Sequence, residues 1–255
     1  MQSIFQTILF QPIFNLFVLG YNFIPDVGVV IILLTFIIKL ALYPSTAASI
    51  KAQKSLTDLQ PKINAIKKQH EGNQQLIATE TMKIYQEHKV NPLGSCLPLL
   101  IQLPILIALY WVLQAGLTNE PLSGSGVAPL SLLYSFVPNP GQINTISLGL
   151  FDLSKTGNVI LALLAGVAQF WQFRMMTNNR PPKDAGTGAK DEDMAAVMNK
   201  QMMFMMPAMT IFIGIKFPAG LALYWLVSTV LTGLQQILIF KKPTEVEVIS
   251  SSPKN

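Results

Sequence analysis

Charge is scarce in this sequence. Only 12% of its 255 residues are Asp, Glu, Lys or Arg, whereas a typical soluble domain carries about 25%. Cysteine is almost absent, since Cys96 stands alone, which excludes an intramolecular disulfide and a cysteine-rich metal site. His70 and His88 are the only histidines, and two histidines eighteen residues apart argue against a zinc site. We therefore expect no metal ion and no cofactor.

Long apolar runs dominate what is present. Hydrophobic residues make up 51% of the chain and the mean hydropathy is +0.43, so we predict an all-α, polytopic membrane protein. We expect five transmembrane helices, at 27–43, 96–115, 158–174, 202–216 and 219–240. The segments between and around them are predicted to be an outer N-terminal interfacial helix (1–26), a cytoplasmic helical hairpin (44–95), an external loop (116–157), a cytoplasmic loop (175–201) and a short cytoplasmic tail (241–255).

The orientation follows from the basic residues. Fifteen of the 18 Lys and Arg residues fall in 44–95, in 174–201 and after residue 240. Cytoplasmic segments carry the excess of Lys and Arg in membrane proteins, so the N-terminus is expected outside and the C-terminus in the cytoplasm. An extra span within 1–26 is the alternative to the interfacial helix, and Pro12 and Pro25 count against it.

The hairpin is predicted from a helical repeat. Apolar residues recur at spacings of three and four, at Ala52, Leu56, Leu59, Ile63 and Ile66. Gly72 interrupts the repeat, and a second helix is expected over 74–88. A solvated loop is the alternative, and the regular apolar stripe favours two helices joined by a turn.

One cation lies inside an apolar run. Lys39 is surrounded in the sequence by Ile, Leu and Ala, and Thr35 lies one helical turn before it on the same face. An ammonium at a membrane helix centre costs roughly 2.5 to 3.5 kcal/mol on insertion scales, so such a residue is a candidate functional site. The alternative is that Lys39 extends along the apolar surface to the lipid headgroups.

Other polar residues lie in the predicted spans. The candidates for a polar binding surface are Thr35, Lys39, Gln102, Gln169, Trp225 and Ser228. Gln102 and Gln169 have the alternative role of joining helices by hydrogen bonds, and Trp225 and its neighbour Tyr224 that of interface anchors. No carboxylate falls in any span, which disfavours a proton relay and leaves Lys39 without an anionic partner there. This favours a hydrated cavity around Lys39.

Two long motifs carry a resemblance to a known family. The segments NPLGSCLPLLIQLPILIALYWVL (91–113) and FPAGLALYWLVSTVLTGLQQ (217–236) closely resemble distinctive segments of the YidC family of membrane protein insertases. That family includes mitochondrial oxidase-assembly and chloroplast albino-type relatives. The segments LLTFIIKLALYP and LQPKINAIKK, together with the predicted five-span layout, extend the similarity over most of the chain.

The resemblance implies a fold and a site. It implies five transmembrane helices around a hydrophilic groove that is open to the cytoplasm and closed to the outside. Lys39 matches a cationic groove position that is usually arginine in the family, and lysine keeps the charge but loses the planar bidentate fork. Thr35, Gln102 and Trp225 match groove or substrate-contacting positions, and residues 44–95 match a hairpin needed for function.

The implied activity is that of a membrane insertase and chaperone without catalytic chemistry. Its expected partners are nascent membrane proteins and the lipid bilayer, with the Sec translocase and the ribosome as candidates and no specific nucleic acid. The expected location is the bacterial cytoplasmic (inner) membrane. The rival is a small-molecule transporter or channel with Lys39 as an anion site. An intramembrane enzyme is disfavoured, because Ser228 has no histidine or carboxylate near it in the spans.

Overall fold

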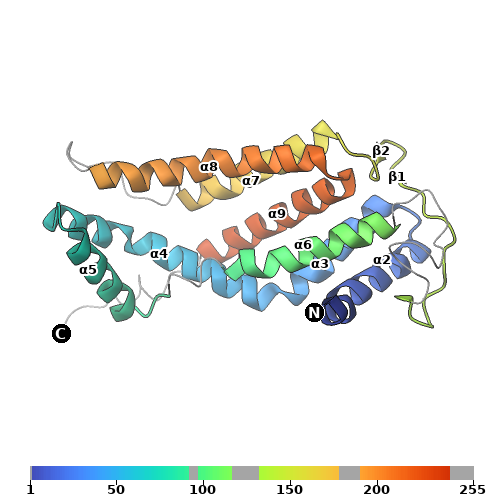
Figure 1. The fold of residues 1–255 in the computed structure, drawn as a ribbon, viewed down its shortest axis with the longest axis horizontal. Helices are drawn as coiled ribbons and strands as arrows, with labels where there is room; N and C mark the ends of the chain where they lie inside the picture. Colours follow the sequence, from blue (N-terminus) through green and yellow to red (C-terminus); the bar gives the residue numbers. More distant parts are fainter. Residues whose placement is uncertain (1, 92–96, 117–131, 178–189, 242–255) are drawn as a thin grey trace. The chain divides into compact units, whose positions relative to one another are not determined.

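The computed structural model describes residues 2–91, 97–116, 132–177 and 190–241, and it is mostly helical (Figure 1). The helices are α1 (Gln2–Phe5), a π-helical turn η1 (Gln6–Phe10), α2 (Gln11–Phe23), α3 (Val27–Ala41), α4 (Tyr43–Gln69), α5 (Gln74–Glu87), α6 (Leu97–Gly116), α7 (Val159–Thr177), α8 (Lys190–Lys216) and α9 (Ala219–Phe240). Two strands, β1 (Ile146–Ser147) and β2 (Phe151–Asp152), form an antiparallel pair.

The chain divides into two compact units. The first comprises Met1–Leu42, Leu99–Gln169 and Pro207–Leu231, and the second comprises Tyr43–Pro98, Phe170–Met206 and Thr232–Asn255. Helices α7, α8 and α9 each contribute residues to both units. The two units are described separately below.

The first unit has one large apolar core. Helix α2 packs along α3, and its buried residues include Phe14, Phe17 and Val18. Helices α6 and α9 join the same core through residues such as Leu109 and Leu221. The N-terminal helix is therefore largely a protein-packed element, although we expected an interfacial one. The chain remains helical past Pro12, which lies just after the π-helical turn η1.

The outer faces of these helices are apolar as well. On α3 the exposed large residues are Ile32, Leu33, Phe36, Ile37 and Leu40, and α6, α7 and α8 have comparable exposed residues. A helix that is apolar all round is either deeply buried or faces lipid. Since these side chains are exposed, the pattern favours contact with lipid hydrocarbon.

The apolar helices differ in length. Among the described residues, α9 alone is long and apolar enough to cross a bilayer by itself, and α3 with α4 passes only if the two count as one broken span. The other apolar stretches are Leu100–Ala115, Val159–Met175 and Met203–Lys216. Crossing ~30 Å of hydrocarbon takes about 20 residues. The predicted bounds of the fifth span, 219–240, agree with α9.

A loop in the first unit, residues 132–157, is called here the cap loop. It holds the β1–β2 pair, which is a small departure from an all-helical fold. Side chains of α2 bond its backbone: Asn15 donates to Leu132 O at 2.8 Å and accepts from Tyr134 N at 2.7 Å. The Tyr21 hydroxyl accepts from Asn144 N at 2.8 Å. The cap loop is thus held by side chains far away in the sequence.

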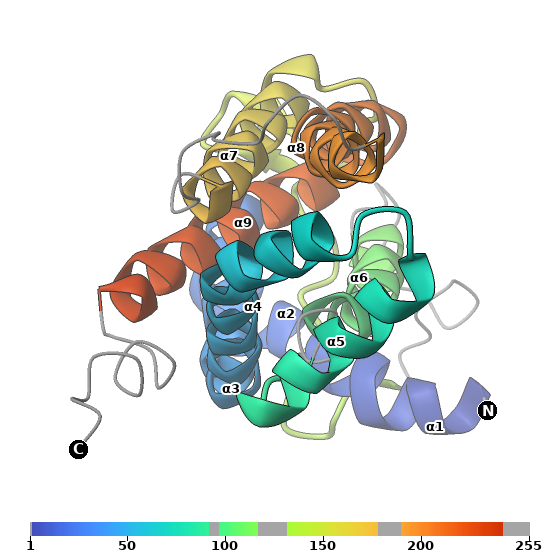
Figure 2. The same ribbon diagram turned by 90° about the vertical axis from the view of Figure 1, so that its left-hand side faces the viewer.

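The second unit contains the predicted hairpin, seen in Figures 1 and 2 as α4 and α5. Leu59 and Ile63 of α4 are buried, and Ile84 and Tyr85 pack against them. The turn between the helices contains Gly72, whose φ of 84° is in the left-handed region that glycine tolerates. Helices α4 and α5 thus pack together within the predicted hairpin segment, and the first of them begins at Tyr43.

One loop prediction needs correction. We expected residues 175–201 to form a cytoplasmic loop, but α7 continues to Thr177 and α8 begins at Lys190. The sequence from 190 is rich in Ala and Met, which have high helix propensity, so the helix extends well before the apolar run. The remainder of that loop, and the predicted tail after Lys241, lie outside the described residues.

Candidate functional site

Lys39 and Thr35 lie on one face of α3. Thr35 is fully buried, and its hydroxyl donates to Ile31 O at 2.6 Å, so this bond stays within its own helix. Lys39 is half-buried in the last turn of α3, where the helix carbonyls favour a cation. Its sequence neighbours Ile38 and Leu40 are apolar, so the ammonium is held on an otherwise hydrophobic segment.

Helices α6 and α9 are joined by a polar network. The Gln102 side-chain amide donates to the Tyr224 hydroxyl at 2.6 Å. The Ser228 hydroxyl, one turn along α9, is hydrogen-bonded to the same Tyr224 oxygen. Tyr224 and Ser228 are both buried, whereas Gln102 is partly exposed. Gln102 and Ser228, which were both predicted as site residues, are therefore connected through Tyr224, which was not.

Helices α7 and α8 are joined by another polar pair. The Thr210 hydroxyl donates to the Gln169 side-chain oxygen, and both residues are buried. The same helices approach closely at Gly166 and Gly214, which face Ile211 and Ala162 respectively. Gln169 thus forms a bond that joins two helices, which was its alternative predicted role. That Gln169 also lines a polar groove is a proposal.

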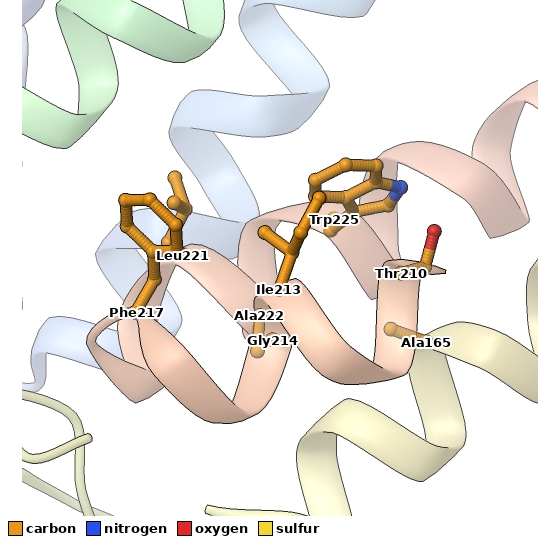
Figure 3. Close-up of a pocket in the computed structure, with 8 residues that line it drawn as sticks. All are labelled: Ala165, Thr210, Ile213, Gly214, Phe217, Leu221, Ala222 and Trp225. Atoms are coloured by element: carbon orange, nitrogen blue, oxygen red, sulfur yellow. The ribbon is translucent and has the colours of Figure 1, made fainter. Parts of the chain in front are cut away.

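Trp225 lines a narrow crevice (Figure 3). The figure places it with residues of α7, α8, α9 and the turn between α8 and α9, namely Ala165, Thr210, Ile213, Gly214, Phe217, Leu221 and Ala222. Apart from the Thr210 hydroxyl and the Trp225 indole N–H, the lining side chains are apolar. The crevice thus suits an apolar group better than a charged one.

Two hydrogen-bond partners, Tyr224 and Thr210, were not predicted from the sequence. Tyr224 was considered an interface anchor, but it is only 1% exposed and forms the centre of the network. Thr210 was counted only as part of an apolar run. The one available signal was that Gln102 and Gln169 need hydrogen-bond partners inside apolar helices. Among the described residues, no three His, Cys, Asp or Glu side chains gather as a metal site.

Comparison with known proteins decides the family. The family model of the 60Kd inner membrane protein matches residues 19–246. A Membrane protein insertase YidC from Fusobacterium nucleatum subsp. nucleatum is 34% identical over 221 residues, covering 87% of this chain and 89% of that protein. The chain belongs to the 60Kd inner membrane protein family.

Longer members of the 60Kd inner membrane protein family are similar too. The Membrane protein insertase YidC of Vibrio cholerae is 35% identical over 231 residues, which are 91% of this chain but only 36% of that protein. A solved structure, "Active YidC insertase crystal structure with the first transmembrane domain resolved", matches with a TM-score of 0.59 at 23% identity. The match covers 95% of this chain and 47% of that one, and it supports the fold.

Proposed function

We propose that this chain is a membrane protein insertase and chaperone of the bacterial inner membrane, acting without catalytic chemistry. Membership of a family whose similar relatives are named membrane protein insertases carries the proposal. Its substrates are hydrophobic segments of nascent membrane proteins, and the lipid bilayer is its other partner. The Sec translocase and the ribosome are candidate partners through the cytoplasmic segments.

The proposed layout has five spans around a groove that opens to the cytoplasm, with the N-terminus outside. The predicted groove residues are Thr35, Lys39, Gln102, Gln169, Trp225 and Ser228. The Gln102 amide supports this reading, because it is only partly buried and so can exchange its bond to Tyr224 for one to a substrate. Lys39 supplies the positive charge that attracts an acidic flank.

The short apolar stretch of α8 supports local thinning of the bilayer. Met203–Lys216 has 14 residues and spans only about 21 Å at 1.5 Å per residue, less than the ~30 Å of bilayer hydrocarbon. A short span is accommodated in part by thinning of the surrounding lipid. A polar flank of a substrate would then cross less hydrocarbon, which lowers its desolvation cost.

The cap loop supports closure on the outside. Asp26, at the start of α3, accepts from the Ser147 hydroxyl at 2.6 Å and from Leu148 N at 2.7 Å. Backbone bonds tie the same loop to the start of α9, including Gly220 N to Leu153 O at 2.9 Å. A polar flank that enters from the cytoplasm would therefore meet a fixed outer wall, and its apolar segment would leave sideways into lipid.

The test is insertion of a single-span substrate with a short acidic tail by purified protein in liposomes. We expect wild type and Lys39→Arg to insert it, and Lys39→Ala and Lys39→Glu to lose most of the activity. Lys155→Ala is the control, because it removes an equal charge from an exposed side chain. Full activity of Lys39→Ala and Lys39→Glu would overturn the charge mechanism.

A small-molecule transporter or channel is the competing function. It requires a path open to both faces, whereas an insertase groove is accessible from the cytoplasm alone. Single cysteines at positions 35, 39 and 102, in a chain in which Cys96 is replaced by serine, distinguish the two. Labelling by a membrane-impermeant maleimide from the outside would favour the transporter.

A further inference from the structure

The second unit contains an interface whose buried residues are mostly polar. On the first turns of α4, Thr46, Ser49 and Lys54 are buried beside Ile50, and on the last turns of α9, Gln235 and Gln236 are buried beside Ile239. We call Thr46, Ser49, Gln235 and Gln236 the polar seam. Elsewhere in the same unit α4 buries Leu59 and Ile63, as a helix of a packed domain ordinarily does.

Two hydrogen-bonded contacts lie on either side of Ser49 and Gln236. The Thr46 hydroxyl and the Gln235 side-chain amide are bonded, with Gln235 Nε2 to Thr46 Oγ1 at 3.0 Å. Further along both helices, Lys54 Nζ donates to Phe240 O at 3.4 Å, near the end of α9. Because these contacts advance together along α4 and α9, Ser49 and Gln236 fall between them in each helix.

Ser49 and Gln236 have unsatisfied polar atoms. Each residue is 1% exposed, yet neither Ser49 Oγ nor Gln236 Oε1 has a hydrogen-bond partner among the residues that the structure describes. Most buried polar atoms in native proteins are bonded, and an exception calls for a specific explanation. Trp171 covers α9 one turn before Gln236, since it lies against Gly233.

The chemistry of these atoms selects a ligand. Gln236 Oε1 can only accept a hydrogen bond, and Ser49 Oγ can donate or accept. A carboxylate or phosphate would not bond to the amide oxygen. A cation would be repelled by the buried Lys54 in the same interface. The group that fits is a neutral donor such as a peptide N–H.

We infer that the polar seam is a binding site for the backbone N–H groups of the polar flank of an inserting segment. This inference rests on the proposed insertase function. A polar flank brings one N–H per residue, and these groups need acceptors when they leave water. The seam supplies an acceptor in a protected place, separate from the charge of Lys39, and so serves flanks of any charge.

The first test is disulfide trapping in liposomes with the full chain and Cys96 replaced by serine. Gln236→Cys is compared with Leu238→Cys, which lies two residues along α9 and is 62% exposed. The substrate is a single span with one cysteine in its polar flank. We expect flank disulfides at position 236 during insertion and few at position 238. Equal trapping at both positions, or none at 236 while insertion proceeds, would overturn the inference.

A solvent-filled seam predicts a different result. Water at the seam would let a soluble maleimide label Gln236→Cys without any disulfide to the substrate, and this outcome also overturns the inference. If the unmodified chain inserts no substrate at all, the proposed function fails first. A maleimide-reactive seam in a chain without insertase activity would then identify a hydrated interface only.

The second test removes the unsatisfied atoms. We expect Gln236→Leu and Ser49→Ala to slow insertion of a polar-flanked substrate by roughly fivefold, since one hydrogen bond is lost for each. Their thermal stability is expected to stay level or rise, and insertion of a substrate without a flank to be unchanged. Gln235→Leu is the control that lowers stability, because it breaks the bond to Thr46. Unchanged insertion of both substrates by both variants would overturn the inference.

Discussion

The cap loop and the polar seam use polar groups in opposite ways. At the cap loop, Asp26 accepts hydrogen bonds from Gly28 N, Val29 N, Ser147 Oγ and Leu148 N. At the seam, the Gln236 amide oxygen is buried and has no hydrogen-bond partner in the described part of the chain. A satisfied network fixes one arrangement, whereas an unsatisfied acceptor favours any state in which a donor reaches it. The cap loop is thus held in one arrangement, and the seam suits the proposed ligand.

The largest expected effect comes from crowding the cap. A methyl group at Gly28 would overlap the Ser147 hydroxyl and lie 2.8 Å from the Ser147 Cβ. We expect Gly28→Ala to destabilise the protein by about 3 kcal/mol, near the upper end for overpacking, measured by thermal unfolding in detergent. The double variant with Ser147→Gly should recover part of that loss. Equal stability of Gly28→Ala and wild type would contradict the close packing of the cap on α3.

Removal of the cap's anchor should have the next largest effect. Asp26→Ala deletes the N-cap of α3 together with both bonds to the cap loop. We expect a loss of about 2 kcal/mol, because an N-cap alone contributes up to that amount. Asp26→Asn keeps an acceptor oxygen and should lose less. The measurement is the free energy of unfolding in denaturant, and equal losses for the two variants would argue against the cap role.

The Asp26 carboxylate also gives a dependence on pH. Burial raises its pKa, but the hydrogen bonds from Ser147, Leu148, Val29 and Gly28 outweigh this and hold the pKa below the ordinary 3.8. A lowered folded-state pKa contributes stability that is present above pH 3.8 and is lost as the pH falls further. Asp26→Asn should remove that part of the acid sensitivity.

The bonded pair Gln102 and Tyr224 in the first unit should lose stability on mutation, as the cap loop does. Comparing this pair with Gln236 tests the difference between satisfied and unsatisfied polar groups. Gln102→Leu breaks a satisfied bond to Tyr224 and should cost about 1 kcal/mol. Gln236→Leu removes an unsatisfied atom and should cost nothing or stabilise the protein. A double-mutant cycle of Gln102→Leu with Tyr224→Phe measures the coupling. An equal loss of stability in Gln102→Leu and Gln236→Leu would contradict the distinction between bonded and unbonded side chains.

The smallest effect is expected at the far end of the cap loop. Bonds from the Ser154 hydroxyl and from Lys155 lower the pKa of Asp152 to about 2, against a smaller opposing effect of burial. Its contribution to stability is present above pH 3.8 and is lost as the pH falls through about 2. Asp152→Asn should therefore flatten the stability profile slightly between pH 4 and pH 2, as followed by acid unfolding.

Much of the fold was predictable because its signals are local. The apolar run of α9 begins after Pro218 and ends before Lys241, so its bounds 219–240 could be read directly. The two helices α4 and α5 were equally predictable, because Leu59 and Ile63 repeat at helical spacing and Gly72 marks the turn. The beginning of α8 was missed, because its first turns are polar and only helix propensity distinguishes them from a loop.

The sequence by itself determined the class of protein, the helical segments and the set of polar residues within them. It also determined the charge at Lys39, since no other cation lies inside an apolar run. Tertiary structure decided which polar atoms meet. Gln102 and Tyr224 are 122 residues apart, and Asp26 and Ser147 are 121 apart. Such pairings depend on how helices pack, which is a sum over many apolar contacts that no local pattern records. The same packing buries Gln236 Oε1 where no other described residue bonds to it, although in the sequence Gln236 is simply another glutamine.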